Sequence, residues 1–143
     1  MIRKALASDG SAIKLLLESC QLPTEDLSPT LLEDFLLLEQ AGMLQGVVGL
    51  QIFAGVALLR SLAVRAGFRG QGWGQQLTRQ AEDLARQRGV GHLYLLTITA
   101  AGLFSTHGYQ PVSRHQAPQA IQASAEFQSL CPASAVLMCK TLD

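Results

Sequence analysis

Residues 64–74 read Val64-Arg-Ala-Gly-Phe-Arg69-Gly70-Gln-Gly72-Trp-Gly74 and are the most informative stretch of the chain. They follow an apolar segment at 56–64 that predicts a β-strand and lead into residues 72–88, whose apolar positions recur with helical spacing. Glycines let a backbone turn tightly and approach a ligand, and the free N–H groups at a helix start attract phosphate. The stretch therefore predicts a phosphate-binding turn, with an ordinary glycine turn as the alternative.

Two other phosphate-binding motifs fit this stretch poorly. A P-loop needs a lysine after its glycines, and residues 64–74 contain none. A dinucleotide-binding fingerprint needs the spacing G-x-G-x-x-G and an acidic residue about 20 positions later. Here the spacing is G-x-G-x-G, and residues 91–95 contain no carboxylate. Neither class of nucleotide-binding protein is predicted.

The segments on either side of this turn predict the rest of the fold. Ser8 and Asp9 are N-cap candidates for a first helix, Thr30 is the candidate cap of a short second helix, and Glu82 is expected to face solvent. A strand, helix and strand in that order imply a right-handed crossover and a parallel pair. We expect one α/β domain over residues 1–143, with a mixed, mostly antiparallel sheet of about six or seven strands, flanked by helices, with a central parallel pair. The predicted strands are 2–5, 35–39, 46–51, 56–64, 92–97, 109–114 and 134–142.

Composition excludes several classes of protein. The chain has 143 residues, of which 48% are hydrophobic and 15% charged, which fits a compact core rather than disorder. No apolar run approaches the roughly 18 residues that a membrane span needs, so no membrane partner is expected. The chain meets Asp9 and Gly10 before any long apolar segment, so we expect no secretory signal and a cytoplasmic location.

The charges are unevenly distributed although the formal net charge is zero. Residues 1–59 carry three basic and seven acidic side chains, whereas residues 60–88 carry six arginines and two acidic side chains. An arginine excess beside a glycine cluster indicates an anionic ligand. A nucleic-acid partner is not expected, because a basic stripe for nucleic acid would make the whole domain basic.

The three cysteines, Cys20, Cys131 and Cys139, are odd in number and lack C-x-x-C spacing. Neither a disulfide framework nor a metal site is predicted from them. Trivalent arsenic binds thiolates, so a metalloid site formed by Cys131 and Cys139 is one alternative. Buried, inert thiols are the favoured interpretation, because free cysteine is among the most buried residue types.

Residues 64–74 resemble the acetyl-coenzyme A (acetyl-CoA) binding motif of the GCN5-related N-acetyltransferase (GNAT) family. Arg69, Gly72 and Gly74 match its core, [RQ]-x-x-G-x-[GA]. The resemblance runs along the whole chain, with Phe104 and Gly108 in a later family motif. It implies the GNAT fold, acetyl-CoA as cosubstrate, and acetyl transfer to the primary amine of a small molecule by direct attack in a ternary complex. A homodimer is compatible with it.

The resemblance also implies roles for residues of the turn. The N–H groups of residues 69–74 would hold the pyrophosphate, the backbone of residues 62–64 would pair with the pantetheine arm, and the Val64 N–H would polarise the thioester carbonyl. The expected cofactor-binding set is Leu62, Ala63, Val64, Arg69, Gly70, Gln71, Gly72, Trp73, Gly74, Thr97 and Phe104.

Two residues depart from the family pattern. Phe104 stands where many members have the tyrosine that protonates the leaving thiolate, and Thr97 stands where many have asparagine. A phenyl ring cannot donate a proton, so the thiolate is expected to leave unassisted or to be protonated by water. Tyr109 and His107 are the less favoured acids.

Candidate residues for the acceptor amine are spread along the chain. Arg60 interrupts an apolar strand and, with period-2 alternation, would share a face with Leu62 and Val64, where it would grip a substrate carboxylate or arsinate. A structural ion pair is its alternative.

Arg114 is a second substrate-binding candidate. Glu33, Asp34 or Glu39 is the candidate acceptor of the ammonium proton, directly or through water. For each of these residues, an ordinary surface role is the alternative.

Three segments, 58–64, 93–100 and 125–136, resemble a branch of the family called arsenic-resistance N-acetyltransferases of the second type. This resemblance implies a small amino-acid-like acceptor, including arsenic- or phosphorus-containing toxicants. A different class of function is a non-catalytic acyl-CoA-binding or thiol-based metalloid-sensing module, suggested by Phe104 and the three thiols. Acetylation of a protein terminus or lysine is a third hypothesis.

Overall fold

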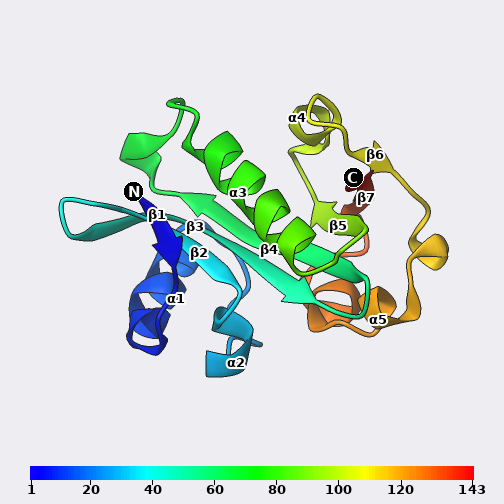
Figure 1. The fold of residues 1–143 in the computed structure, drawn as a ribbon, viewed down its shortest axis with the longest axis horizontal. Coiled ribbons are helices and arrows are strands. Elements are labelled where there is room, and N and C mark those ends of the chain that lie inside the picture. Colours follow the sequence, from blue (N-terminus) through cyan, green and yellow to red (C-terminus); the bar gives the residue numbers. More distant parts are fainter. The chain divides into compact units, whose positions relative to one another are not determined.

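The computed structural model describes all residues, Met1–Asp143, and divides into two compact units (Figure 1). The first comprises Met1–Gln51 and Leu59–Leu84, and the second Ile52–Leu58 and Ala85–Asp143. Strand β4 (Val56–Val64) contributes residues to both. Seven strands are hydrogen-bonded in the order β1-β2-β3-β4-β5-β7-β6, and β4 and β5 form the one parallel pair. The predicted mixed sheet with a parallel pair is confirmed.

The first unit contains the N-terminal antiparallel strands of the sheet. Ser28, not Thr30, caps its second helix, because the Ser28 hydroxyl accepts the Leu31 N–H at 3.1 Å and Pro29 occupies the first helical position. Its elements are β1 (Ile2–Lys4), α1 (Gly10–Ser19), α2 (Pro29–Leu32), β2 (Phe35–Gln40), most of β3 (Met43–Ile52), part of β4 and most of α3 (Trp73–Gln87), with 3₁₀ turns at Ala7–Asp9 and Ala66–Phe68.

Helices α1 and α3 cover opposite faces of the strands of the first unit. Val47 packs in a buried cluster with Ile13 and Leu17 of α1. At Gly46, the residue immediately before Val47 in the strand, a Cβ atom would lie 3.1 Å from Leu77 of α3. Successive side chains of a strand point to opposite faces. The sheet is therefore covered on both sides, which explains why β2 is a continuous apolar run and not an alternating one.

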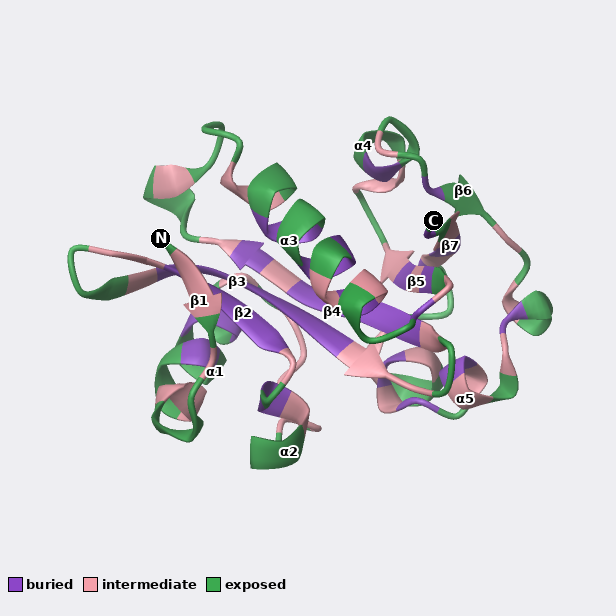
Figure 2. Ribbon diagram, in the orientation of Figure 1, coloured by how far each residue is buried: buried purple, intermediate pink, exposed green.

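Helix α3 buries a wider stripe than its apolar positions predict (Figure 2). Leu77 and Ala81 are fully buried as expected, but Thr78 and Glu82 are also buried. The expectation that Glu82 faces solvent is therefore wrong. None of the helices has the length and apolar character that a membrane crossing requires.

The second unit is built on β5 (His92–Thr97), which pairs antiparallel with β7 (Val136–Thr141), and β7 pairs with β6 (Gln110–Pro111). Its core cluster contains Leu58, Ala117, Ile121 and Leu137. The predicted strand over 109–114 is wrong beyond Pro111, where a 3₁₀ turn soon follows. The remaining elements are α4 (Ala101–Ser105), the 3₁₀ turn Arg114–Gln116, α5 (Gln119–Gln122) and a π-helical turn at Glu126–Leu130.

Gly49 tests the packing of the first unit. It lies opposite Phe35 in the β2–β3 register, and a Cβ atom at Gly49 would lie 2.4 Å from two atoms of the Phe35 ring. Gly49→Ala is therefore expected to lower the free energy of unfolding by about 1 to 3 kcal/mol, as overpacking of a core does. Urea denaturation followed by circular dichroism measures this change.

Gly67→Ala is the matched control, because a Cβ atom at Gly67 meets nothing within 4 Å and its φ is not positive. It should change the unfolding free energy by less than about 0.5 kcal/mol. Equal stabilities of the two variants would contradict the packing described for Gly49.

Candidate functional site

The turn between β4 and α3 has the geometry that its glycines predict. Strand β4 ends at Val64, and α3 begins at Trp73. Gly70 and Gly72 have φ values of +79° and +84°, and a Cβ atom at either would meet open space. An L side chain is strained in this left-handed region, so the backbone conformation itself favours glycine.

The start of α3 points N–H donors out of the helix end. Its first turn is closed by the Gln76 N–H, which donates to the Gly72 carbonyl at 3.1 Å. The N–H groups of the first turn have no acceptor within a helix, and the helix dipole adds partial positive charge there. Gly74 has open space at its Cβ position, so the backbone is accessible to a ligand. This turn can bind an anion such as a phosphate.

Arg69 stabilises the turn through contacts within the first unit. Its Nε donates to the Val64 carbonyl at 2.9 Å, and its Nη2 lies 3.5 Å from the Sγ of Cys20. The next residue after the strand, Arg65, donates its N–H to the Gln45 carbonyl at 2.7 Å. The carbonyl of Val64 is thus bonded to the motif arginine, a contact that the sequence did not predict.

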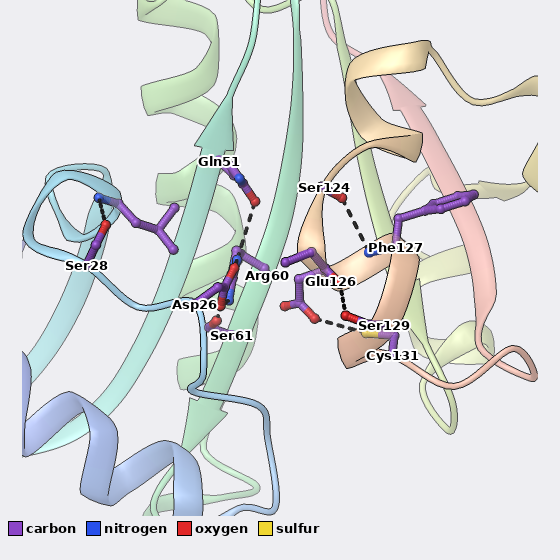
Figure 3. A network of polar contacts seen from close by, with 12 residues as sticks. Asp26, Ser28, Gln51, Arg60, Ser61, Ser124, Glu126, Phe127, Ser129 and Cys131 are labelled. Carbon is purple, nitrogen blue, oxygen red and sulfur yellow. Dashed lines mark hydrogen bonds and ion pairs between the residues drawn. The ribbon is translucent and has the colours of Figure 1, made fainter.

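Arg60, in the middle of β4, is a buried charge with a bidentate partner (Figure 3). Its side chain is only 1% exposed, and Nη1 and Nη2 donate to the two carboxylate oxygens of Asp26 at 2.5 and 2.7 Å. Nε donates to the Ser61 hydroxyl at 3.1 Å, and Nη1 to the Gln51 side-chain oxygen at 3.3 Å. These contacts are those of a structural ion pair, which was the alternative to substrate binding for Arg60. Sequence reasoning missed Asp26.

The alternation expected for β4 is broken at Ser61, which has a φ of +57°. Arg60 contacts Asp26 in the segment that joins α1 to α2, and Ala63 packs in the cluster formed with α1. The positive φ of Ser61 interrupts the regular alternation on which the expected shared face of Arg60, Leu62 and Val64 depends, and that shared face stays a prediction.

The other candidate site residues each have contacts of their own. Glu33 is exposed directly after α2. In the second unit, the Thr97 hydroxyl accepts the Ala100 N–H at 3.0 Å. Phe104 is buried there, with its ring edge-to-face on Tyr109 at a centroid distance of 5.5 Å. Arg114 stacks over the Phe127 ring at 4.9 Å and donates to the Pro132 carbonyl at 3.1 Å, so its contacts are those of a structural residue.

The two cysteines considered for a metalloid site have different partners. Cys131 donates to the buried carboxylate of Glu126 at 3.0 Å (Figure 3). Burial raises the pKa of the Cys139 thiol, and the hydrogen bond with Tyr94 opposes this shift. The pKa of Tyr94 is raised as well, chiefly by burial. No group of three or more His, Cys, Asp or Glu side chains could hold a metal ion.

Comparison with known proteins identifies the family of the domain. The family model described as "Acetyltransferase (GNAT) domain" matches residues 32–111, more than half of the chain. An uncharacterised N-acetyltransferase of Chlorobaculum tepidum is 28% identical over 84% of this chain and 81% of its own length. The amino-acid acetyltransferase of Pseudomonas aeruginosa is 31% identical over 68% of this chain, but the match spans only 23% of that protein.

Solved structures show the same fold. N-acetylglutamate synthase from Neisseria gonorrhoeae, complexed with coenzyme A and N-acetyl-glutamate, superposes with a TM-score of 0.88 at 22% identity, over all of this chain and 35% of that chain. A Mycobacterium tuberculosis protein in complex with CoA superposes with a TM-score of 0.83 at 19% identity, over 100% of this chain and 99% of that chain. By its matched domain and its fold, the chain belongs to the GNAT family of acetyltransferases.

Proposed function

We propose that this protein transfers the acetyl group of acetyl-CoA to the primary amine of a small amino-acid-like molecule, by direct attack in a ternary complex. The observation that carries the proposal is the turn between β4 and α3, where Gly70 and Gly72 open the backbone at a helix start in a GNAT family member. Relatives named amino-acid acetyltransferases support the acceptor class, although this chain spans less than a quarter of their length. Both units would act together as one domain.

The turn would bind the pyrophosphate of acetyl-CoA through the N–H groups of residues 69–74. A helix dipole contributes only about 0.3 to 1 kcal/mol, so most of the affinity would come from several N–H bonds to one pyrophosphate. The backbone of residues 62–64 would pair with the pantetheine arm as an added strand. Solved neighbours complexed with coenzyme A support this assignment.

The reaction needs a polarised carbonyl and a deprotonated amine. The Val64 N–H would polarise the thioester carbonyl, and a carboxylate such as the exposed Glu33, directly or through water, would take the ammonium proton. Acetyl-CoA supplies a thioester whose thiol has a pKa of about 8.5 when free, so the thiolate is a tolerable leaving group at neutral pH. Water would then protonate it.

The acceptor class includes arsinic and phosphinic amino acids. We include these acceptors because residues 58–64, 93–100 and 125–136 resemble the arsenic-resistance branch of the family. This part of the acceptor class stays a prediction from the sequence. A thiol-based metalloid site is less favoured, because Cys131 and Cys139 bond to Glu126 and Tyr94 respectively.

Thiol release in the presence of acetyl-CoA tests the function. The panel consists of free amino acids, arsinic and phosphinic amino acids, polyamines and peptides. We expect turnover with at least one amino-acid-like amine and none with peptides or polyamines. Cofactor binding in a thermal-shift assay without turnover on any amine would contradict catalysis and favour the binding-module alternative.

Gly72→Ala tests the cofactor turn, and Gly55→Ala is its matched control, since both glycines have a positive φ and open space at the Cβ position. Both substitutions should destabilise the fold to a similar degree, because each strains the backbone. Only Gly72→Ala should weaken coenzyme A binding, by 10-fold or more in isothermal titration calorimetry. Equal dissociation constants for the two variants would place the pyrophosphate elsewhere.

Tyr109→Phe tests whether the thiolate needs a protein acid. The Tyr109 ring is 1% exposed, packs against Phe104 and lies 5.6 Å from the Lys140 ammonium nitrogen, contacts that fit a packing role. We expect kcat to remain within about 3-fold of the wild type at pH 7.5. A loss of about 10²-fold or more would instead assign the proton transfer to Tyr109.

A further inference from the structure

Residues 119–128 of the second unit line a surface hollow of about 540 Å³ that no step of the proposed reaction uses. Its lining consists of Gln119, Gln122, Ala123, Phe127 and Gln128. Pockets that take small molecules have volumes of about 300 to 1,000 Å³. The lining lies beyond residues 32–111, the part of the chain that matches the acetyltransferase family model. The hollow is therefore a feature of this chain outside the matched domain.

Hydrogen bonds around α5 hold the hollow in shape. The Ser124 hydroxyl donates to the Ile121 carbonyl at 2.7 Å and accepts the Phe127 N–H at 3.3 Å, which ties α5 to the π-helical turn that follows it. The Cys131 N–H donates to the Glu126 carbonyl at 3.0 Å and closes that turn. The Phe127 side chain points away from Glu126 and Cys131 (Figure 3), and neither of these two residues belongs to the lining.

Gln122 offers the hollow a hydrogen-bond acceptor of fixed orientation. Its Nε2 donates to the Ala117 carbonyl at 2.8 Å and to the His115 carbonyl at 3.3 Å. Both amide hydrogens are used in this way, and the reversed amide would place its oxygen against two carbonyl oxygens. The Gln122 Oε1 accepts no hydrogen bond within the protein and is not buried. A ligand in the hollow therefore meets an oxygen that accepts and does not donate.

Gln119 and Gln128 add two side-chain amides that are exposed and make no hydrogen bond within the protein. An amide holds a donor and an acceptor side by side, and this arrangement binds adenine at N6 and N7. None of the lining residues carries a charge. The hollow therefore fits a neutral group that has donors and acceptors along one edge.

The aromatic wall of the hollow is the Phe127 ring, which also binds a cation. The Arg114 guanidinium lies 4.9 Å from the ring centroid and is held there by the Pro132 carbonyl at 3.1 Å. A cation over an aromatic face draws the π electrons of the ring toward it. A ring that has lost electron density stacks well on an electron-rich purine, whereas the C–H groups of a sugar bind better to an electron-rich ring. The wall therefore favours a purine over a carbohydrate.

From these features we propose that the hollow is a binding site for the adenine base of a free nucleoside, and that it binds this base independently of coenzyme A. The base stacks on Phe127, and its exocyclic amino group donates to the Gln122 Oε1. The amide of Gln119 or Gln128 bonds to the ring nitrogens. The inference concerns binding alone and does not rest on acetyl transfer.

Isothermal titration calorimetry of the full chain with adenosine tests the inference, with and without saturating coenzyme A. We expect a dissociation constant of about 0.1 mM, as ligands of this size usually reach, and a change of less than about 2-fold when coenzyme A is present. Inosine has an oxygen in place of the exocyclic amino group. It should bind about 10-fold more weakly, because the Gln122 Oε1 then faces a second acceptor.

Two variants and a matched control locate the site. Phe127→Leu should weaken adenosine binding by about 10-fold, which is the cost of one lost base–aromatic stack. Gln128→Ala should weaken it by about 3-fold or more through the lost hydrogen bonds. Gln87→Ala is the control, since Gln87 is also an exposed glutamine of the second unit but lies on α3, outside the lining. It should bind adenosine as the wild type does.

Four results would overturn the inference. The first is no saturable binding at millimolar adenosine, and the second is equal affinity of the wild type, Phe127→Leu and Gln128→Ala. The third is loss of adenosine binding in saturating coenzyme A, which would place adenosine in the cofactor site. The fourth is saturable binding of N-acetylglucosamine without binding of adenosine. If Phe127→Leu does not fold, Gln128→Ala decides, because its side chain makes no bond within the protein. A wild type that acetylates no amine would contradict the proposed function and leave this test unchanged.

Discussion

A guanidinium buried in an apolar strand must be neutralised, and much of the first unit is arranged around this requirement. An isolated buried charge is very costly, and removal of one partner of such a pair typically costs about 3 to 5 kcal/mol, less where one partner is partly exposed. Arg60 therefore brings a carboxylate from a distant turn onto β4. Asp26, 34 residues earlier in the chain, is held there. The same strand contains the left-handed residue Ser61, whose hydroxyl accepts from Arg60.

The second constraint on the fold is the tight turn that follows the end of β4. After Val64 the backbone turns twice through conformations that favour glycine and then begins α3. Such a turn leaves several backbone N–H groups free at the start of the helix. These groups can bind a pyrophosphate without the help of side chains. Membership of the GNAT family follows from the matched domain. The need for a turn with free N–H groups explains why glycines occur between β4 and α3.

Most of the sheet could be predicted from the sequence because its strands are marked by apolar runs and glycine turns. The segments 56–64, 72–88 and 92–97 lie within one or two residues of β4, α3 and β5. The turn between β4 and α3 was predictable for the same reason, since its glycines are local signals. The sequence offers both Ser28 and Thr30 as caps with the same chemistry, and Pro29, which occupies the first helical position, distinguishes Ser28 as the cap.

The long-range contacts of β4 were harder to predict. The pairing of Arg60 with Asp26 is a long-range contact, and no local pattern distinguishes Asp26 from the other acidic residues of the first 59 positions. The left-handed backbone at Ser61, which interrupts the alternation expected for β4, could not be predicted either, because serine carries no signal for a positive φ. An arginine in an apolar strand does predict that some carboxylate must approach it. This is the one signal in the sequence that points to an ion pair for Arg60.

The most direct measurement is a titration of ¹⁵N-labelled protein with coenzyme A, followed by amide chemical shifts. The account predicts that the largest changes fall on residues 62–64 and 69–74, because their N–H groups would form the new hydrogen bonds. Saturating shifts confined to other residues, or no shifts at millimolar coenzyme A, would contradict the central claim that the turn between β4 and α3 holds the cofactor.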